Sequence, residues 1–199
     1  MAHFVTLEGI DGTGKSTLAR SLGRRLKEAG VDVVRTKEPT SSWLGDAVRR
    51  AVEEDEDPRV QTLLFLADRG VHVERITEWL SEGKVVLCDR FHDSTLAYQR
   101  VALDGKVDDP RDWLERASTF ITLEPDLTLL LLLDPAEGLA RISATRARSP
   151  FERVAFLTQV QEVYKELARS PRFVTLDASL PRTKLARAAE EAVLTRLRA

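Results

Sequence analysis

The stretch "GIDGTGKSTLARSLGRRL", from Gly9 to Leu26, decides the fold, because a glycine-rich turn runs directly into an amphipathic helical pattern. Gly9, Gly14, Lys15 and Ser16 satisfy the spacing G-x-x-x-x-G-K-[ST], and an apolar strand candidate precedes them. Glycines let successive backbone N–H groups point inward, and the start of the following helix adds its positive end. The stretch therefore predicts a loop that holds the phosphates of a nucleoside triphosphate with Mg²⁺.

Two side chains of this loop have predicted tasks. Lys15 is expected to bridge the outer phosphates, and the hydroxyl of Ser16 is expected to ligate the phosphate-bound Mg²⁺. A glycine turn can also be a simple connection between a strand and a helix, but the complete motif in this context favours nucleotide binding. The residues predicted to bind the nucleotide are Gly9, Ile10, Asp11, Gly12, Thr13, Gly14, Lys15, Ser16 and Thr17.

Strand-like and helical patterns alternate along the rest of the chain. Short apolar runs predict strands at 4–8, 31–36, 84–89, 127–134 and 173–177. Helical periodicity fills 15–29, about 43–54, 59–81, about 93–101, about 110–119, 136–147, 151–169 and 181–198. Such alternation is typical of parallel strands joined by right-handed crossovers. We therefore predict one three-layer α/β domain over residues 1–199.

Composition limits the class of protein. The 199 residues are 43% hydrophobic and 31% charged, as in an ordinary globular domain with one core. The net charge of −2 gives no basic field, so neither nucleic acid nor a membrane is an expected partner. The first residues lack the pattern of a secretory signal, and the apolar run at 127–133 is too short to span a bilayer. A cytoplasmic location is expected.

The sequence gives no sign of a disulfide, of a reactive cysteine or of a metal site built from histidines. Cys88 is the single cysteine, which excludes an intramolecular disulfide, and its place in the run "KVVLC" predicts a buried, unreactive thiol. His3, His72 and His92 are scattered and lack the spacing of metal ligands. We expect them to be ordinary hydrogen-bonded or exposed imidazoles.

The segments that follow the strands carry the candidate chemistry, because open α/β sheets hold ligands beyond the carboxyl ends of their strands. After the first four strands they read "GIDGTGKS", "KEPTSS", "DRFHDST" and "DPAEG". The base-reading N-K-x-D of a GTPase is absent, and the third strand ends in "CDRF" rather than in the Asp-Glu pair of a motor ATPase. Among the classes that share the phosphate loop, small-molecule kinases remain.

Downstream residues indicate a second site, for a flat base. Phe65 and Arg69 in "LLFLADR" are four residues apart in a predicted helix and share one face. An aromatic ring beside a guanidinium suits a base with a carbonyl edge, through stacking and hydrogen bonds. The polar candidates in "DRFHDSTLAYQ" (89–99) are Asp89 and Arg90 at the strand tip, Ser94 and Tyr98 one helical turn apart, and Gln99.

Together these stretches resemble the thymidylate kinase family over nearly the whole chain. The resemblance is carried by "GIDGTGKST", "KEP", "LLFLADR", "DRFHDSTLAYQ" and the late helix "FLTQVQEVYKELA" (156–168), in this order and spacing. It implies transfer of a phosphoryl group from ATP to dTMP, giving dTDP and ADP. It also implies a five-stranded parallel sheet in the P-loop kinase arrangement, and usually a homodimer.

The resemblance implies roles on the base side of the acceptor. Phe65 matches the aromatic residue that stacks on thymine, and Arg69 matches the arginine that reads a thymine carbonyl. Gln99 matches a position near the base. Glu38 lies at the acidic position of the family after the second strand, and is taken as a substrate-binding candidate.

It also implies roles around the sugar and phosphate. Arg90 matches the arginine that grips the dTMP phosphate, and Asp11 matches the carboxylate that bonds the 3′-hydroxyl. Tyr98 occupies the position that crowds the sugar 2′-carbon and so favours deoxyribose, and Ser94 lies one turn before it. Asp89 fits a carboxylate that organises Mg²⁺ and water, which makes Ser16 and Asp89 the predicted metal-binding pair.

The catalytic arginine is expected in a lid. Some family members place an arginine inside the phosphate loop, where this chain has Gly12. The segment "RISATRARSPFER" (about 141–153) lies between two predicted helices, where a lid over ATP is expected, and supplies four arginines. Arg146 and Arg148 are the catalytic candidates, with Lys15, Asp89 and Arg90. For Arg141 and Arg153 a solvated helical face is an equal alternative.

Departures from the family pattern leave alternatives open. The family often reads Arg-Glu-Pro-Gly-Gly where this chain has "KEPTSS", and Pro150 stands where the lid pattern has an arginine. A glycine-rich stretch is common where this chain reads "RVALDG". The alternatives are a P-loop kinase of another nucleoside monophosphate or of a deoxynucleoside, and a nucleotide sensor that has lost turnover.

Overall fold

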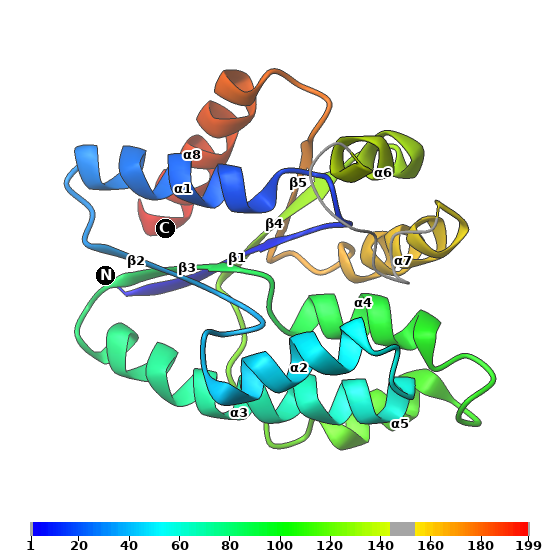
Figure 1. Ribbon diagram of the computed structural model, residues 1–199. Helices are drawn as coiled ribbons and strands as arrows, with labels where there is room; N and C mark the ends of the chain where they lie inside the picture. The colour runs from blue at the N-terminus through cyan, green and yellow to red at the C-terminus, as the bar shows by residue number, and fades with distance from the viewer. Residues whose placement is uncertain (1, 144–153, 199) are drawn as a thin grey trace.

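The computed structural model describes residues 2–143 and 154–198, and its centre is a parallel sheet of five strands (Figure 1). The strand order is β2-β3-β1-β4-β5, and each neighbouring pair is parallel. The strands are β1 (His3–Glu8), β2 (Val33–Lys37), β3 (Val85–Asp89), β4 (Leu127–Leu132) and β5 (Phe173–Asp177). The predicted α/β class and five-stranded parallel sheet are confirmed, with the order of a P-loop kinase.

The inner strands are apolar along their length because both of their faces are covered. β3 is buried at all five positions, and β1 is buried from Phe4 to Glu8. β1 pairs with β3 on one side and β4 on the other, with Leu7 opposite Asp89 and Leu129. This register brings the end of β1, where the phosphate loop begins, beside the end of β3.

Helices cover both faces of the sheet. α1 and α8 share a core cluster with one face, while residues of α3, α4 and α7 form two clusters on the other (Figure 1). α2 packs against α3, and α5 packs against α4. The helices are α1 (Lys15–Glu28), α2 (Trp43–Glu53), α3 (Pro58–Ser81), α4 (His92–Ala102), α5 (Pro110–Ala117), α6 (Pro135–Ser143), α7 (Val154–Leu167) and α8 (Arg182–Arg198).

Local chemistry explains where these helices start. The Ser42 side chain accepts the Gly45 N–H at the start of α2, and the Asp57 side chain accepts the Arg59 N–H at the start of α3, where Pro58 fills the first turn. Gly14 precedes α1 with φ 88°, a left-handed conformation that suits glycine. The acidic residues from Glu53 to Glu56, at the end of α2 and before α3, are exposed.

Two strand ends differ from the prediction by two residues, and the other differences are of one residue. β2 begins at Val33 rather than at residue 31, because the Val31 N–H donates to the Leu26 carbonyl and closes the end of α1. β4 ends at Leu132 rather than at residue 134, because Asp134 stands at the start of α6, where its Oδ1 accepts the N–H groups of Ala136 and Glu137. The helical patterns at 136–147 and 151–169 reach into 144–153, which lies outside the described residues.

The predicted burial of Cys88 is confirmed. Cys88 is fully buried, burial raises the pKa of its thiol well above the usual value, and its Sγ–H donates to the Arg90 carbonyl. Within residues 2–143 and 154–198 no group of three or more His, Cys, Asp or Glu side chains could hold a metal ion. No helix in the same residues combines the length and apolarity needed to cross a bilayer.

Candidate active site

The phosphate loop connects β1 to α1 and packs against α6. Gly12 has φ 83°, and a Cβ built there would lie 2.0 Å from the Gly138 carbonyl oxygen of α6. Any side chain at this position therefore meets both a strained backbone and a fixed carbonyl. The loop cannot carry an arginine at position 12 in this arrangement.

Lys15 extends back over the loop from the first turn of α1. Its Nζ donates to the carbonyl oxygens of Gly9 at 2.9 Å and Ile10 at 2.8 Å. The side chain is buried, and burial lowers its pKa to about 8, with Arg90 as the next contribution. The ammonium is thus held at the mouth of the loop, charged at neutral pH, where the phosphates of a nucleotide are expected.

Ser16 and Asp89 form the only predicted metal-binding pair, and the structure brings them together. Ser16 Oγ donates to Asp89 Oδ2 at 2.5 Å, which joins the start of α1 to the end of β3. A hydroxyl and a carboxylate side by side at a phosphate loop are oxygen ligands of the type that Mg²⁺ takes. Because Mg²⁺ keeps several waters and binds phosphate oxygens, these two protein ligands fit a nucleotide-bound Mg²⁺.

Arg90 is the centre of the second predicted cluster. Its backbone has φ 71°, and its guanidinium donates to Asp11 Oδ1 at 2.5 Å and to Ser94 Oγ at 3.1 Å. The guanidinium also lies over the Tyr98 ring, 5.0 Å from the centroid, and the Tyr98 hydroxyl donates to Asp11 Oδ2 at 3.0 Å. The structure therefore brings Asp11, Arg90, Ser94 and Tyr98 together from the loop, the tip of β3 and α4.

Glu8 lies beneath this cluster and was not singled out from the sequence. Its Oε1 accepts the Phe91 N–H at 2.8 Å, and the hydroxyls of Ser94 and Tyr164 donate to Oε2 at 2.5 and 2.9 Å. Burial raises the pKa of Glu8 from 4.5 to about 7, with nearby Asp93 adding to the rise. An acid at the last position of an otherwise apolar strand is the signal that points to it.

The raised pKa of Glu8 predicts a pH-dependent stability that Glu8→Gln removes. Folded protein keeps the Glu8 proton up to about pH 7, whereas the unfolded chain loses it near 4.5. Between these values the folded state binds more protons, so the Glu8 contribution to the free energy of unfolding falls as pH rises. Relative to wild type, we expect Glu8→Gln to become more stable by at least about 1 kcal/mol from pH 5 to pH 8.

Urea unfolding of both proteins at pH 5 and pH 8 measures this difference. Glutamine keeps the size of the side chain and an acceptor for the Phe91 N–H, so the Glu8→Gln variant is expected to keep the wild-type fold. Parallel changes of stability with pH in the two proteins would show that Glu8 does not titrate in this window.

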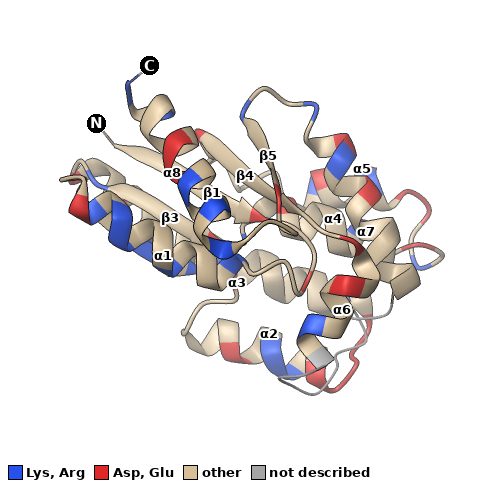
Figure 2. Cartoon of the chain, turned by 90° about the horizontal axis from the view of Figure 1, so that it is seen from above, with Lys and Arg blue, Asp and Glu red and all other residues tan. Residues whose placement is uncertain are grey.

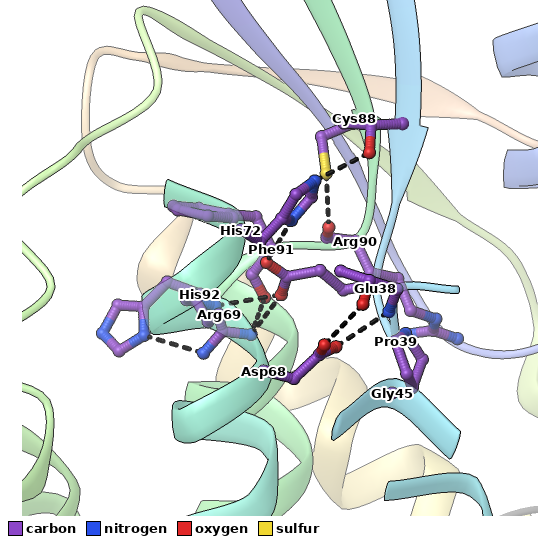
Figure 3. Close-up of polar contacts among 12 residues, drawn as sticks. Glu38, Pro39, Gly45, Asp68, Arg69, His72, Cys88, Arg90, Phe91 and His92 are labelled. Atoms are coloured by element: carbon purple, nitrogen blue, oxygen red, sulfur yellow. Dashed lines mark hydrogen bonds and ion pairs between the residues drawn. The ribbon is translucent and has the colours of Figure 1, made fainter. Parts of the chain in front are cut away.

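Arg69, which the sequence predicts to read the base, lies beside Glu38 and Phe91 (Figure 3) and is almost fully buried. Its Nε and Nη2 donate to Glu38 Oε2 at 2.9 and 2.6 Å, and Nη2 also donates to the Phe91 carbonyl at 3.1 Å. Phe65 lies one turn earlier on α3 and is half-buried. The structure therefore joins Arg69 to Glu38, and the Glu38 carboxylate faces the arginine.

A cleft of about 1040 Å³ opens at the carboxyl ends of the strands. It is lined by the phosphate loop, the ends of β2 and β3 and the start of α8, and Figure 2 shows basic residues on α1, α2 and α6. Its basic lining residues are Lys15, Arg24, Arg25, Lys37, Arg49, Arg90, Arg141 and Arg182. Glu38 and Asp89 also line it, whereas Phe65, Arg69, Tyr98 and Gln99 do not. Such a lining suits a polyphosphate.

The geometry above is that of a nucleotide-binding P-loop fold with a second polar cluster, and comparison with known proteins identifies its family. A sequence profile of thymidylate kinase matches residues 7–189. The chain belongs to the thymidylate kinase family. Proteins named "Probable thymidylate kinase" from Methanospirillum hungatei and Methanoculleus marisnigri are each 44% identical to it, over 192 and 186 residues.

These relatives align with most of the chain and of their own length. The alignments cover 95% and 92% of this chain and 92% and 90% of the respective relatives. A protein of the same name from Natronomonas pharaonis is 38% identical over 197 residues, which is 97% of this chain and 98% of that protein. Membership of the thymidylate kinase family therefore rests on nearly the whole sequence.

Within the thymidylate kinase family, the lid is the predicted part that the structure does not place. Arg146, Arg148 and Arg153 lie outside the described residues. Arg141 is described, and its guanidinium donates to Glu137 Oε1 at 2.7 Å and to the Ala178 carbonyl at 3.1 Å. Arg141 thus lines the cleft while pairing with its own helix.

Gln99 is the remaining member of the predicted base site. It is buried in α4, and its Oε1 has no hydrogen-bond partner among residues 2–143 and 154–198. A buried amide oxygen without a partner is unfavourable unless a ligand or water completes it. A ligand that offers an N–H group would complete the Gln99 oxygen.

Proposed function

We propose that this protein transfers the γ-phosphoryl group of ATP to dTMP, giving dTDP and ADP, as a thymidylate kinase. The observation that carries the proposal is the Arg90 cluster, because its guanidinium stands next to the phosphate loop, paired with Asp11 of that loop at 2.5 Å. An arginine there is suited to hold the phosphate of a second nucleotide in line with the triphosphate. A cytoplasmic location belongs to the same proposal, because both substrates are soluble nucleotides.

Phosphoryl transfer asks the protein mainly to align the reacting groups and to neutralise charge on the transferring oxygens. In our proposal, the loop amides and Lys15 hold the ATP phosphates, and Arg90 orients the acceptor phosphate. Ser16 and Asp89 would hold Mg²⁺, which supplies positive charge to the phosphate oxygens when bound. Asp11 and Tyr98 are placed to meet the acceptor sugar, because both lie against the Arg90 guanidinium.

We assign to the lid the further positive charge that neutralises the transferring phosphoryl group. The clash that a Cβ at Gly12 makes with the Gly138 carbonyl supports a source outside the phosphate loop. We assign this role to Arg146 and Arg148, which the sequence places between α6 and α7, on the segment that follows the cleft-lining Arg141 and Ile142. A lid arginine reaches the transferring phosphoryl group only when both substrates are bound, which protects ATP from water.

An assay of ADP release over a panel of acceptors tests the proposed function. We expect the highest kcat/KM with dTMP, among dTMP, dUMP, UMP, CMP, AMP, GMP and thymidine. Strong turnover of another acceptor with negligible turnover of dTMP would favour a kinase of different specificity. ATP binding without turnover of any acceptor would favour a nucleotide sensor.

We further propose a homodimer formed through α3. Val60, Leu63, Ala67 and Val71 lie on one face of this helix and are exposed, with 45%, 54% and 54% exposure for Val60, Leu63 and Val71. An apolar stripe of this kind on a helix marks a surface that another molecule covers. A second copy is the proposed occupant, because a two-fold axis beside α3 would pair the stripe with itself.

Leu63→Glu is expected to convert the dimer into a monomer. The substitution places two carboxylates, one from each copy, in an apolar interface around the symmetry axis, where neither finds a partner. Light scattering coupled to size-exclusion chromatography measures the mass, and Thr195→Glu on the exposed face of α8 serves as the charge-matched control. A dimeric Leu63→Glu protein would place the interface elsewhere, and a monomeric wild type would rule out the homodimer.

A further inference from the structure

A chain of hydrogen bonds leads from β2 to the guanidinium of Arg69 (Figure 3). His72 Nδ1 lies 2.9 Å from Glu38 Oε1, and His72 Nε2 lies 2.7 Å from the hydroxyl of Thr36 in β2. The other oxygen of Glu38 holds Nε and Nη2 of Arg69. Because a carboxylate oxygen only accepts, His72 Nδ1 carries a proton, and in the neutral ring Nε2 accepts from Thr36.

The side chains of Arg69, Glu38 and His72 in this series of hydrogen bonds are all buried. The exposed fraction is 1% for the Arg69 side chain and 4% for the side chains of Glu38 and His72. A buried ion pair is stable only when its remaining hydrogen-bonding capacity is satisfied. His72 fulfils that condition, because it occupies the Glu38 oxygen that Arg69 leaves free.

Glu38 and the Phe91 carbonyl engage one edge of the Arg69 guanidinium, and the Nη1 edge has only a longer contact among the described residues. Nε and Nη2 face Glu38 and the Phe91 carbonyl, whereas Nη1 makes a long 3.4 Å approach to His92 Nδ1. Burial, then Arg69 and Arg172, lower the pKa of His92 to about 3, so this ring is neutral and can accept from Nη1, but the distance of 3.4 Å makes the bond weak. The hydrogen bonds that Nε and Nη2 of Arg69 make therefore fix the direction in which Nη1 points.

We propose that Glu38 and His72 are positioning residues that fix Arg69 for the 4-carbonyl of the acceptor base, and that they thereby set the preference for thymine over cytosine. The inference rests on the proposed dTMP kinase activity. Glu38 acts through Arg69, because Arg69 donates to one of its oxygens while His72 holds the other. A fixed N–H donor favours the thymine carbonyl and faces the 4-amino group of cytosine unfavourably.

A neighbouring anchor on α3 provides a matched control. Asp68 accepts the Thr40 N–H at 2.8 Å, the Thr40 hydroxyl at 2.5 Å and the Ser42 hydroxyl at 3.0 Å. These bonds hold the same loop after β2 and make no contact with Arg69 in the described residues. Thr40→Val therefore loosens the loop while leaving the Glu38–Arg69 pair in place.

The experiment compares kcat/KM for dTMP and dCMP in four variants. Glu38→Gln is expected to lower the dTMP-to-dCMP ratio at least about tenfold, because an amide pairs poorly with the guanidinium and lacks its charge complement. His72→Phe, which keeps a ring but removes both nitrogens, is expected to lower the ratio at least about threefold. His72→Asn can still donate to Glu38, so it should recover part of the loss. The KM for ATP should stay within about twofold of the wild-type value in all four variants.

Thermal unfolding of each variant separates positioning from stability. His72→Asn leaves more empty space than His72→Phe, so a merely structural role predicts that the asparagine variant is the more impaired of the two. The inference is overturned if Glu38→Gln and His72→Phe keep the wild-type ratio within about twofold, or if Thr40→Val lowers it equally. Failure of the proposed function itself is distinct, because wild type would then not turn over dTMP.

Discussion

Arg90→Ala is expected to lower kcat/KM for dTMP at least about 100-fold while the Kd for a non-hydrolysable ATP analogue changes less than about threefold. The guanidinium lies beside Asp11 and Ser94. In the proposed function it orients the acceptor phosphate, and its loss removes that charge. The donor phosphates keep the loop amides and Lys15. Steady-state kinetics and calorimetric titration give the two quantities.

Arg90→Lys is the informative comparison for this prediction. A lysine keeps the positive charge but cannot contact two partners at once in the geometry of a guanidinium. We expect it to recover only a minor part of the lost activity. Turnover of dTMP by Arg90→Ala within a few-fold of wild type would contradict the role assigned to Arg90.

Lys15→Met should lower kcat by roughly 10²- to 10³-fold at saturating substrates. The Lys15 ammonium is held at the phosphate loop by the carbonyls of Gly9 and Ile10. In the proposed function it neutralises charge that moves onto the phosphate oxygens during transfer. Methionine keeps most of the buried apolar length of the side chain. The variant is therefore expected to fold with a nearly unchanged melting temperature.

Lys27→Met gives a control on the same helix. Lys27 lies in the last turn of α1 and is exposed, so its loss should leave kcat within about twofold. Single-turnover measurements separate the chemical step from binding and product release. Retention of more than about a tenth of wild-type kcat by Lys15→Met would show that the loop lysine does not carry the expected charge stabilisation.

Much of the fold could be predicted because its signals are local. The apolar runs that form β1 and β3 stand out in the sequence, since strands covered on both faces are apolar throughout. Helix starts such as Pro58 carry their own signals. The shifted start of β2 was missed because it depends on the Val31 N–H, which bonds to the end of α1 instead of to the sheet.

The phosphate-loop half of the site was also predictable, because its residues are contiguous and their spacing is fixed by the phosphates. The pairing of Ser16 with Asp89 follows from the rule that strand ends meet at one edge, and the structure confirms that the two side chains meet. The functional roles of these residues stay predictions until they are measured.

The supporting residues were not predictable, because their importance is set by contacts between distant segments. Glu8 is held by Ser94 and Tyr164, which come from two different helices. His72 was taken as an ordinary imidazole, and it is hydrogen-bonded as expected, but nothing in the sequence shows that its partner is Glu38. Sequence patterns report the element in which a residue lies, not the partner that it meets across the fold.

The loop "KEPTSS" shows how a departure from a family pattern is accommodated. Where the family often has two glycines, this chain has Thr40 and Ser41, and the structure ties Thr40 and Ser42 to the buried carboxylate of Asp68. The loop therefore gains side-chain hydrogen bonds in place of glycine flexibility. The sequence does not reveal that the loop and Asp68 meet, because Asp68 is far from the loop along the chain.

A crystal structure of the protein with an unreactive ATP analogue, Mg²⁺ and dTMP tests the central claim most directly. The account predicts thymine stacked on Phe65 with its 4-carbonyl at Arg69, and the dTMP phosphate at Arg90 facing the triphosphate in the loop. Thymine bound away from Phe65, or a dTMP phosphate that does not contact Arg90, would contradict it.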